Sequence, residues 1–351
     1  MDDGDPGTST RPVDPPSSSA SSSSIAVGTS TDAAIIKSTE DGEFSSLDDE
    51  TRSLTNSIRQ HIVQGGLRYH AYHAGKYVFP NDENEQYRED LKHNLTVYLC
   101  DGELFFAPIH HQLEDGAEVL DLVADIYPES TFQGMDLSPI QPDWIPENVS
   151  FVVDDIEHEA GWTYPENKFD YIHMRHTLPF VRDRPELWER IYQHLKPGGW
   201  FELQEFHYTA ACDDSSCDGP YAWRDFINYL EAGMANLGTD MHGILKAEEE
   251  LAAAGFEELR VKQLKCPVGP WAKKKKLQES GHVLRDVILC GVNGLARRPF
   301  RDGLNWTDIQ IEVFLVDVRK AITAEESNGL PKFHSYYPFR SVWCRKPLNA
   351  A

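Results

Sequence analysis

The chain has 351 residues, of which 40% are hydrophobic, and it contains 16 Phe, 14 Tyr and 8 Trp. This apolar content is enough for a sizeable core and excludes a wholly disordered protein. The formal net charge of -24 repels phosphate backbones and anionic lipid surfaces, so we expect no direct nucleic-acid or membrane partner.

Residues 1–50 form a separate acidic segment rich in Ser and Pro. They carry eleven Asp and Glu residues against two Lys and Arg residues, and a serine tract runs from Ser17 to Ser24. Because large apolar residues are few, burial cannot offset the entropy lost on ordering. We predict a disordered tail, with a phosphorylation-regulated arm as the alternative. The segment resembles neither a secretory signal nor a transit peptide, so we expect an intracellular protein.

Residues 51–107 are predicted to form an N-terminal helical cap. A first helix is indicated by apolar residues at helical spacing and ends at Gly65-Gly66; they are Leu54, Ile58, Ile62 and Val63. A second helix begins near Asp82 and is expected to bury one apolar face, which comprises Tyr87, Leu91, Leu95, Tyr98 and Leu99.

An aromatic loop from Arg68 to Pro80 joins these two helices. Its residue Tyr72 is a candidate for lining a substrate pocket. The alternative is that the aromatic side chains of the loop simply pack onto the sheet.

Residues 108–347 are predicted to form the main α/β domain. Candidate strands are 119–122, 131–137, 149–155, 169–175 and 200–206, and a helix from Arg184 to Leu195 separates the last two. This alternation is typical of a mostly parallel sheet.

The later part of the chain has a different pattern. Helices are expected at 221–237 and 244–254, and a strand at 256–266. A helical insertion of about 270–325 follows, with helices near 273–295 and 307–324, and a final strand covers 335–345.

Acidic residues stand where two of these strands end, and ligands of open parallel sheets bind beyond the carboxyl ends of the strands. Asp136 ends the second strand and could accept hydrogen bonds from the hydroxyls of a ribose; the alternative is a turn or helix-cap acid. Asp154 and Asp155 end the third strand, where one of them could meet an adenine amino group. The alternative for this pair is solvated charge.

Arg175 and His176 end the fourth strand and are candidates for contacts with the cofactor or the substrate. Glu205, His207 and Tyr208 follow the fifth strand. His207 suits a general base because a histidine accepts protons near neutral pH, although a structural histidine explains the same residue. No cysteine or histidine spacing suggests a metal site, so none is expected.

Four segments of the chain resemble fungal methyltransferases of the LaeA type, which regulate secondary metabolism. They are Arg68–Asn81, Met135–Val149, Trp162–Ile172 and His194–Glu205, and the resemblance extends over residues 50–346. It implies a Rossmann-like class I methyltransferase fold with a seven-stranded sheet. It also implies S-adenosylmethionine as the cofactor, with Asp136 at the ribose and Asp154 and Asp155 flanking the adenine. Asp121 and Arg175 complete the expected cofactor contacts.

The resemblance leaves the methyl acceptor open between a small molecule and a protein. It further implies a regulatory role in the nucleus, within a protein complex, while the cytoplasm remains the alternative location. The catalytic candidates are His207, Tyr72 and His176.

One departure from the family pattern concerns the first strand. The family has a glycine-rich turn there, whose backbone amides approach the cofactor, whereas Val119-Leu-Asp-Leu122 is followed by Val-Ala-Asp-Ile-Tyr-Pro128. Val123 to Ser130 also fall short of the roughly 10–12 residues that a parallel crossover with a helix needs. Residues 118–127 can therefore also be interpreted as one helix that replaces the first strand.

Three explanations of the missing turn lead to different functions. A natural loss gives either an enzyme with weakened cofactor binding or a non-catalytic scaffold that binds proteins. A splice variant or a defective gene model would conceal an intact methyltransferase.

Overall fold

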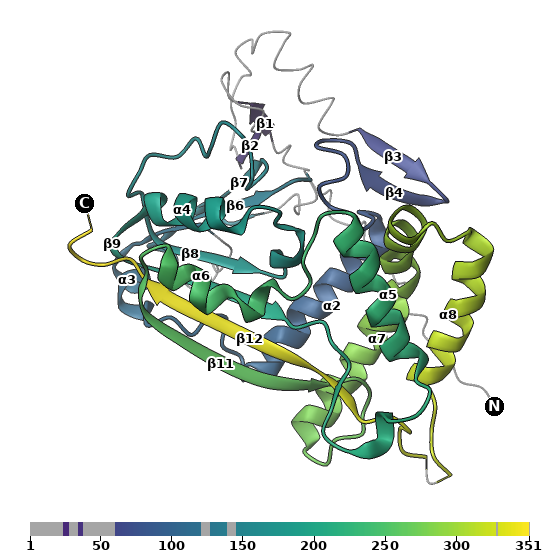
Figure 1. Cartoon of the computed structure of the whole chain (residues 1–351). Coiled ribbons are helices and arrows are strands. Elements are labelled where there is room, and N and C mark those ends of the chain that lie inside the picture. The colour runs from purple at the N-terminus through teal and green to yellow at the C-terminus, as the bar shows by residue number, and fades with distance from the viewer. Residues whose placement is uncertain are drawn as a thin grey trace, which may run out of the picture.

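The computed structural model describes residues 24–27, 34–37, 60–120, 127–138, 145–327 and 329–350. A twisted sheet occupies one half of the molecule, and a group of helices lies at one end of it (Figure 1).

Seven strands form the main sheet in the order β7-β6-β5-β8-β9-β12-β11. Their bounds are Val149–Val153 (β7), Thr131–Asp136 (β6), Glu118–Leu120 (β5), Phe169–Arg175 (β8), Leu195–Phe206 (β9), Ser335–Arg345 (β12) and Glu257–Pro267 (β11). The strands from β7 to β9 are parallel, and β12 runs antiparallel to both β9 and β11. This arrangement confirms the predicted α/β class with a mostly parallel, seven-stranded sheet.

Short strands extend the two sides of this sheet. β2 (Ala34–Lys37) pairs antiparallel with β7 and with β1 (Ser24–Val27), and β10 (Ala211–Cys212) pairs with β12. Most of residues 1–50 lie outside the described residues, so the disordered tail stays a prediction.

β5 is the shortest strand of the main sheet. Leu120 pairs with Gln133 of β6 and with Ile172 of β8, whereas β6 continues to Asp136 and β8 to Arg175. Residues 118–120 are therefore a strand, and the alternative of a single helix over 118–127 is wrong for them. The parallel pairing with both neighbours holds β5 in the sheet although only ten residues, 121–130, connect it to β6. Of these, 121–126 lie outside the described residues.

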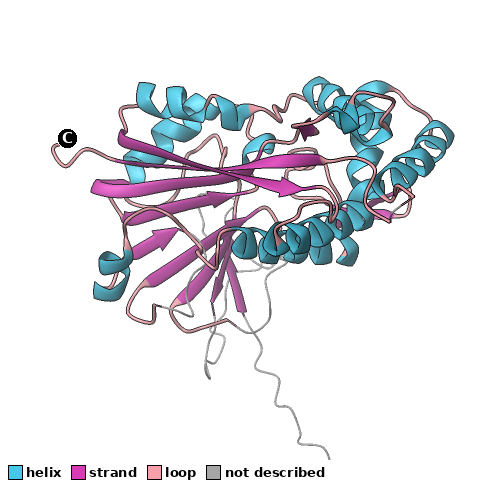
Figure 2. Ribbon diagram, turned by 90° about the horizontal axis from the view of Figure 1, so that it is seen from below, coloured by secondary structure: helices cyan, strands magenta, loops and turns pink. Residues whose placement is uncertain are grey.

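Helices lie against the sheet (Figure 2), and an apolar cluster lies on each of its two faces. On one face, α4 (Arg184–His194) and α6 (Ala247–Ala253) pack with Trp188 and Leu251 against Phe201. On the other face, α3 (His110–Asp115) and the segment before it cover Phe132 and Tyr171.

The helices beyond the sheet share a third apolar core. They are α2 (Glu83–Leu99), α5 (Ala222–Asn236), α7 (Lys275–Arg298) and α8 (Asp308–Ile322). α5 and the short π-helix at Pro299–Gly303 approach each other closely, since a Cβ added at Gly233 would lie 2.4 Å from the Pro299 carbonyl oxygen. The predicted N-terminal cap and the predicted insertion therefore contribute to one helical body.

Two details of the N-terminal cap differ from expectation. Residues 61–64 form β3, which pairs with β4 (Leu67–His70), where a helix was predicted. Gly65 and Gly66 have φ values of +59° and +79°, the left-handed conformation that two-residue hairpin turns require. Residues 51–59 of that predicted helix lie outside the described residues.

The second difference is the buried face of α2. The helix begins after the N-cap Asp82 as predicted, but Tyr87 and Tyr98 are exposed. Its buried side instead carries Glu85, Arg88 and Lys92 together with apolar residues. Hydrogen bonds and ion pairs within the helix compensate these charges, which makes their burial tolerable.

Candidate functional site

Asp136 marks the end of β6 and is exposed. Its Oδ1 accepts a hydrogen bond of 2.7 Å from the amide of Ser138, which is the turn-acid geometry that the sequence left as an alternative. Although the residue is exposed by its accessible area, a dense surrounding of protein atoms raises the pKa of this carboxyl. The Ser138 amide opposes the rise, and the charge of Glu89 adds to it. Glu89 of α2 is thus an electrostatic neighbour of the carboxyl end of β6.

Asp154 and Asp155 follow β7 and are both buried. Asp154 Oδ1 accepts only the amide of its neighbour Asp155, at 2.8 Å, among the bonds found in the described part of the chain. Asp155 is more fully engaged, because Oδ2 lies 2.8 Å from His73 Nδ1 and 3.4 Å from Lys76 Nζ, and Oδ1 accepts the Glu157 amide. Burial alone would raise the pKa of Asp155. The hydrogen bond from His73, the Glu157 amide and the charge of Lys76 together outweigh this effect, so the pKa is lowered.

The aromatic loop lies over this end of β7. Tyr72 is half-buried and stacks on His73, with ring centroids 4.2 Å apart, and His73 in turn binds Asp155. The structure therefore attaches the loop to the predicted adenine end of the site. A role of Tyr72 in catalysis stays a prediction.

Arg175 at the end of β8 is held by three partners. Its guanidinium donates to Gln204 Oε1 at 2.9 Å and to the Leu104 carbonyl at 2.6 Å, and it lies 3.2 Å from His93 Nδ1. These contacts fix Arg175 against β9 and α2. A cofactor contact by this residue stays a prediction, as does one by Asp121, which lies outside the described residues.

His176 and Glu205 form a buried pair where β8 and β9 end. His176 has a left-handed φ of +57°, and its Nδ1 lies 3.3 Å from Glu205 Oε1 while its Nε2 lies 3.0 Å from Thr96 Oγ1. Burial lowers the pKa of His176 well below its ordinary value and raises that of Glu205 to about 8. Glu205 Oε2 has no hydrogen-bond partner within the described residues.

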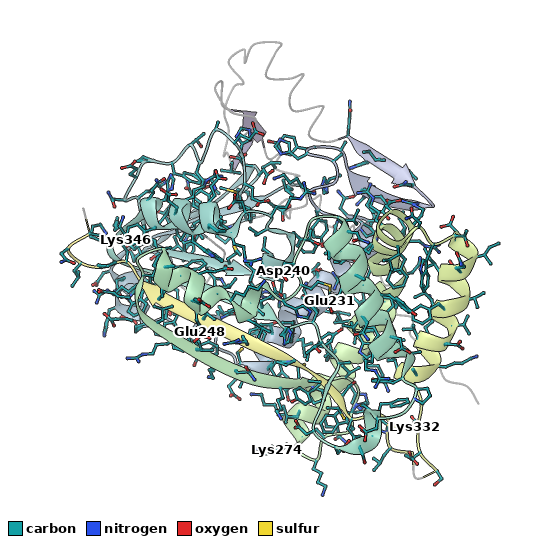
Figure 3. All side chains as sticks on the ribbon, viewed as in Figure 1. Glu231, Asp240, Glu248, Lys274, Lys332 and Lys346 are labelled. Carbon is teal, nitrogen blue, oxygen red and sulfur yellow. The ribbon has the colours of Figure 1, made fainter. Side chains whose placement is uncertain are left out.

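His207 belongs to a second polar chain on the far side of Phe206. Its Nε2 lies 2.8 Å from His242 Nδ1, and His242 Nε2 lies 3.0 Å from the carboxylate of Glu231. Desolvation and the neighbouring His242 lower the pKa of His207 to about 4. Glu231 is on α5 (Figure 3), and nearly half of its side chain is exposed.

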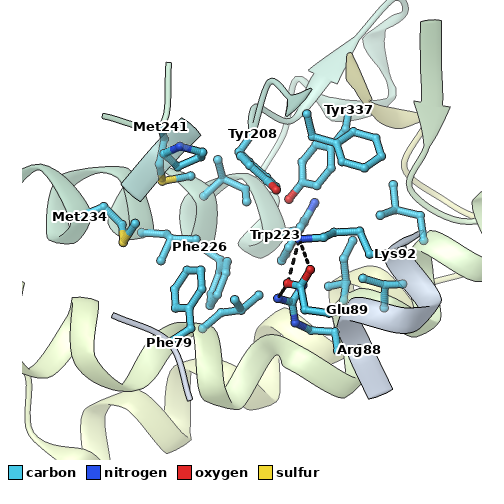
Figure 4. A pocket seen from close by; sticks show the side chains of 18 of the residues that line it. Phe79, Arg88, Glu89, Lys92, Tyr208, Trp223, Phe226, Met234, Met241 and Tyr337 are labelled. Carbon is cyan, nitrogen blue, oxygen red and sulfur yellow. Dashed lines mark hydrogen bonds and ion pairs between the residues drawn. The ribbon is translucent and has the colours of Figure 1, made fainter. Parts of the chain in front are cut away.

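A largely enclosed cavity of about 60 Å³ adjoins the His176–Glu205 pair. It lies between the segments that follow β8 and β9 and helices α2, α5 and α7 (Figure 4). Apolar and aromatic side chains make up most of the wall, including Phe79, Phe180, Phe206, Trp223, Phe226 and Tyr337. Arg88, Glu89 and Lys92 supply one charged side.

Sequence reasoning missed this charged side and Trp223. The available signal was Arg88, Lys92 and Thr96, which recur every fourth residue beside Leu95 and Leu99 and so share their face of the helix.

Within the described residues, no three metal-ligating side chains gather into a metal site. No helix of the described chain is long and apolar enough to cross a membrane.

Several known proteins resemble this chain over most of its length. A family profile described as a methyltransferase domain matches residues 102–249. Methyltransferase pytC of Aspergillus terreus is 32% identical over 311 residues, which cover 86% of this chain and 92% of that protein. Protein-methionine methyltransferase laeA of Emericella nidulans is 31% identical over 307 residues, which cover 84% of this chain and 79% of that protein. Secondary metabolism regulator laeA of Aspergillus flavus is 30% identical over 299 residues, with coverages of 82% and 78%.

Solved structures give a weaker likeness. Phosphoethanolamine N-methyltransferase 2 of Haemonchus contortus, in complex with S-adenosyl-L-methionine, is 13% identical and has a TM-score of 0.39. The alignment covers 84% of this chain and 73% of that one.

The chain is therefore a methyltransferase by class. It belongs to the family that contains pytC and the laeA regulators of secondary metabolism. This confirms the resemblance found in the sequence, and with it S-adenosylmethionine as the cofactor of the family. Membership of this methyltransferase family does not favour the alternative of a non-catalytic scaffold.

Proposed function

We propose that this chain transfers a methyl group from S-adenosylmethionine to an acceptor bound beside the carboxyl ends of β8 and β9. The observation that carries the proposal is the placement of Asp136 and Asp154 at the ends of two adjacent parallel strands. Glu89, whose charge acts on Asp136, also lines the aromatic cavity. When bound, the cofactor supplies an electrophilic methyl group.

The acidic residues fit the nucleoside end of this cofactor. Asp136 is exposed and has a carboxyl group that can accept hydrogen bonds from ribose hydroxyls. Asp154 suits the adenine amino group better than Asp155, since His73, Lys76 and the Glu157 amide already occupy both oxygens of Asp155. Asp155 then positions the aromatic loop over the nucleoside.

The chain also offers a route for the proton that an acceptor hydroxyl or amine loses. His207 is the candidate for this route, because His242 and Glu231 connect it to solvent. The buried His176–Glu205 pair lies next to Phe206 in the cavity wall, but Glu205 already holds a proton and the lowered pKa of His176 opposes a second one. Enclosure of the cavity keeps water away from the reacting atoms.

Titration calorimetry with S-adenosylmethionine and its demethylated product tests this function. We expect micromolar binding by the folded chain and at least a roughly tenfold loss in Asp136→Ala, because one bidentate acceptor is removed. Glu129→Ala is the matched control, since Glu129 is exposed in the turn that precedes the opposite end of the same strand. A folded chain that binds neither compound would overturn the proposal.

We further propose a regulatory role in secondary metabolism for this chain, in the nucleus or the cytoplasm, with a protein complex as its setting. The relatives named laeA support the role. Lys274 extends from the surface just before α7 (Figure 3) and belongs to the basic run 273–276. Tagged protein with this run replaced by Ser tests the nuclear location, and unchanged nuclear accumulation would remove the run from the proposal.

A further inference from the structure

One buried donor in the wall of the aromatic cavity has no acceptor within the described residues. Trp223 is 1% exposed and lines the cavity, yet its indole Nε1 has no hydrogen-bond partner within the described residues. Tyr337 is also buried and contributes to the same wall. A buried donor left unpaired costs about 1–3 kcal/mol. Such groups are therefore expected where a ligand supplies the acceptor.

The charged side of the cavity does not select an ion. Arg88 binds Glu85 at 2.9 Å and also pairs with Glu89, and Lys92 binds Glu89 at 2.7 Å. The two cations and two carboxylates balance one another, so this side offers polarity without net charge. Figure 4 shows Glu89 paired with Arg88 and Lys92 at the edge of the aromatic wall.

We propose that this cavity binds the methyl acceptor, and that the acceptor is an uncharged aromatic small molecule with an oxygen that accepts a hydrogen bond from Trp223. The identification as an acceptor site rests on the proposed methyl transfer. Phe79, Phe226 and Tyr337 offer aromatic surfaces against which a planar ring packs. In Figure 4 the hydroxyls of Tyr208 and Tyr337 point toward the same region as Trp223, so an oxygen-bearing edge of the ligand fits there.

The chemistry of the wall favours a small molecule over a protein segment. Most of the wall is apolar, so it offers few partners for the amide and carbonyl groups of a peptide backbone. Met234 and Met241 form part of the wall. Because methionine is unbranched and flexible, these two side chains can move to admit a whole ring.

Phenol and toluene are suitable probes because they have the same shape and differ in one oxygen. Their binding to the full chain is measured by ligand-observed NMR titration without cofactor. We expect Trp223→Phe to weaken phenol binding roughly tenfold, since the ring stays and only the N–H donor goes, while toluene binding stays the same. Trp306→Phe is the control, because Trp306 packs on Phe300 and Phe314 outside the cavity wall.

Equal phenol affinity in the wild type and Trp223→Phe, or an equal loss for toluene, overturns the proposal. Where circular dichroism shows that Trp223→Phe does not fold, Tyr337→Phe replaces it, with the same expected selectivity for phenol. If the folded chain does not bind the cofactor but Trp223 still confers selectivity for phenol over toluene, the proposed methyl transfer is wrong and the cavity is an aromatic-binding site only. If the chain binds the cofactor but shows no selectivity for phenol, or if it transfers label from the cofactor to protein alone, the proposed aromatic acceptor is wrong and the methyltransferase function stands.

Discussion

His176 Nδ1 lies 3.3 Å from Glu205 Oε1, and Thr96 determines how this pair is protonated. The Thr96 hydroxyl donates to the Lys92 carbonyl at 2.9 Å, so its oxygen accepts from His176 Nε2 at 3.0 Å. Nε2 therefore carries a hydrogen, and a single proton is shared between Nδ1 and Glu205. Burial raises the pKa of Glu205 to about 8 and lowers that of His176, which places this proton on the carboxyl group.

The protonated state of Glu205 predicts a distinctive pH dependence. Burial raises its pKa from the ordinary 4.5 to about 8, so the folded chain holds a proton that the unfolded chain has released. The stability from this proton is fully present below pH 4.5 and is lost as the pH rises through about 8. In Glu205→Gln the fall over this range is expected to disappear. Urea unfolding followed by circular dichroism at several pH values measures it.

Glu250→Gln is the control for that experiment. The Glu250 carboxylate accepts from Arg184 at 2.9 Å, which helps to lower its pKa against the opposing effect of burial. Its contribution is lost only as the pH falls, so this variant should keep the decline toward pH 8. Parallel pH profiles for the wild type and Glu205→Gln would contradict the assignment.

Glu202 joins β9 to the segment before α3. Its Oε2 accepts the amides of Phe106 and Ala107 at 2.7 and 2.8 Å, and its Oε1 accepts the Ser341 hydroxyl at 2.7 Å. We expect Glu202→Gln to lower the free energy of unfolding by about 2–4 kcal/mol, because an amide NH₂ would then face donors. Glu186→Gln removes an exposed partner of Arg190 and should cost less than about 1 kcal/mol. Denaturant unfolding measures both variants, and equal losses of unfolding free energy would contradict the prediction.

The close approach of α5 to Pro299 predicts a small-to-large effect. In Gly233→Ala the new methyl carbon would lie 2.4 Å from the Pro299 carbonyl oxygen, so α5 and the short π-helix must separate. We expect a loss of about 1–3 kcal/mol in thermal unfolding, despite the better helix propensity of Ala. Gly219→Ala, with nothing within 4 Å of the added carbon, should remain close to the wild type.

The two acids after β7 should differ in their effect on cofactor affinity. Asp154→Asn is expected to weaken S-adenosylmethionine binding more than Asp155→Asn, because the Asp155 oxygens are engaged by His73, Lys76 and Glu157. Asp155→Asn should instead loosen the loop that carries Tyr72. Calorimetry gives the affinities, and limited proteolysis reports the loop. The reverse order of affinities would exchange the roles of the two residues.

Patterns confined to one segment predicted most of the fold. Strands 169–175 and 335–345 match prediction residue for residue, because their termini coincide with abrupt changes in the apolar pattern. The hairpin at 61–70 was missed because Ile62 and Val63 fit a helical spacing, whereas the consecutive glycines at 65 and 66 decide the structure.

The site was less accessible to sequence reasoning. Acids at strand ends are local signals, so Asp136 and Asp154 could be proposed. Glu202 accepts hydrogen bonds from Phe106 and Ser341, which are 96 and 139 residues away. No pattern within one segment of the sequence reveals hydrogen bonds between such distant residues. The unpaired Trp223 likewise depends on helices from distant parts of the chain.

The position of β12 determines the order in which the sheet can be completed during synthesis. β12 consists of residues 335–345 yet lies between β9 and β11 and pairs with both. Until residues 335–345 have emerged from the ribosome, β9 and β11 each expose an unpaired edge. The nascent chain must therefore protect two aggregation-prone strands until β12 has emerged, and a nonsense codon shortly before residue 335 would leave both strands exposed for good.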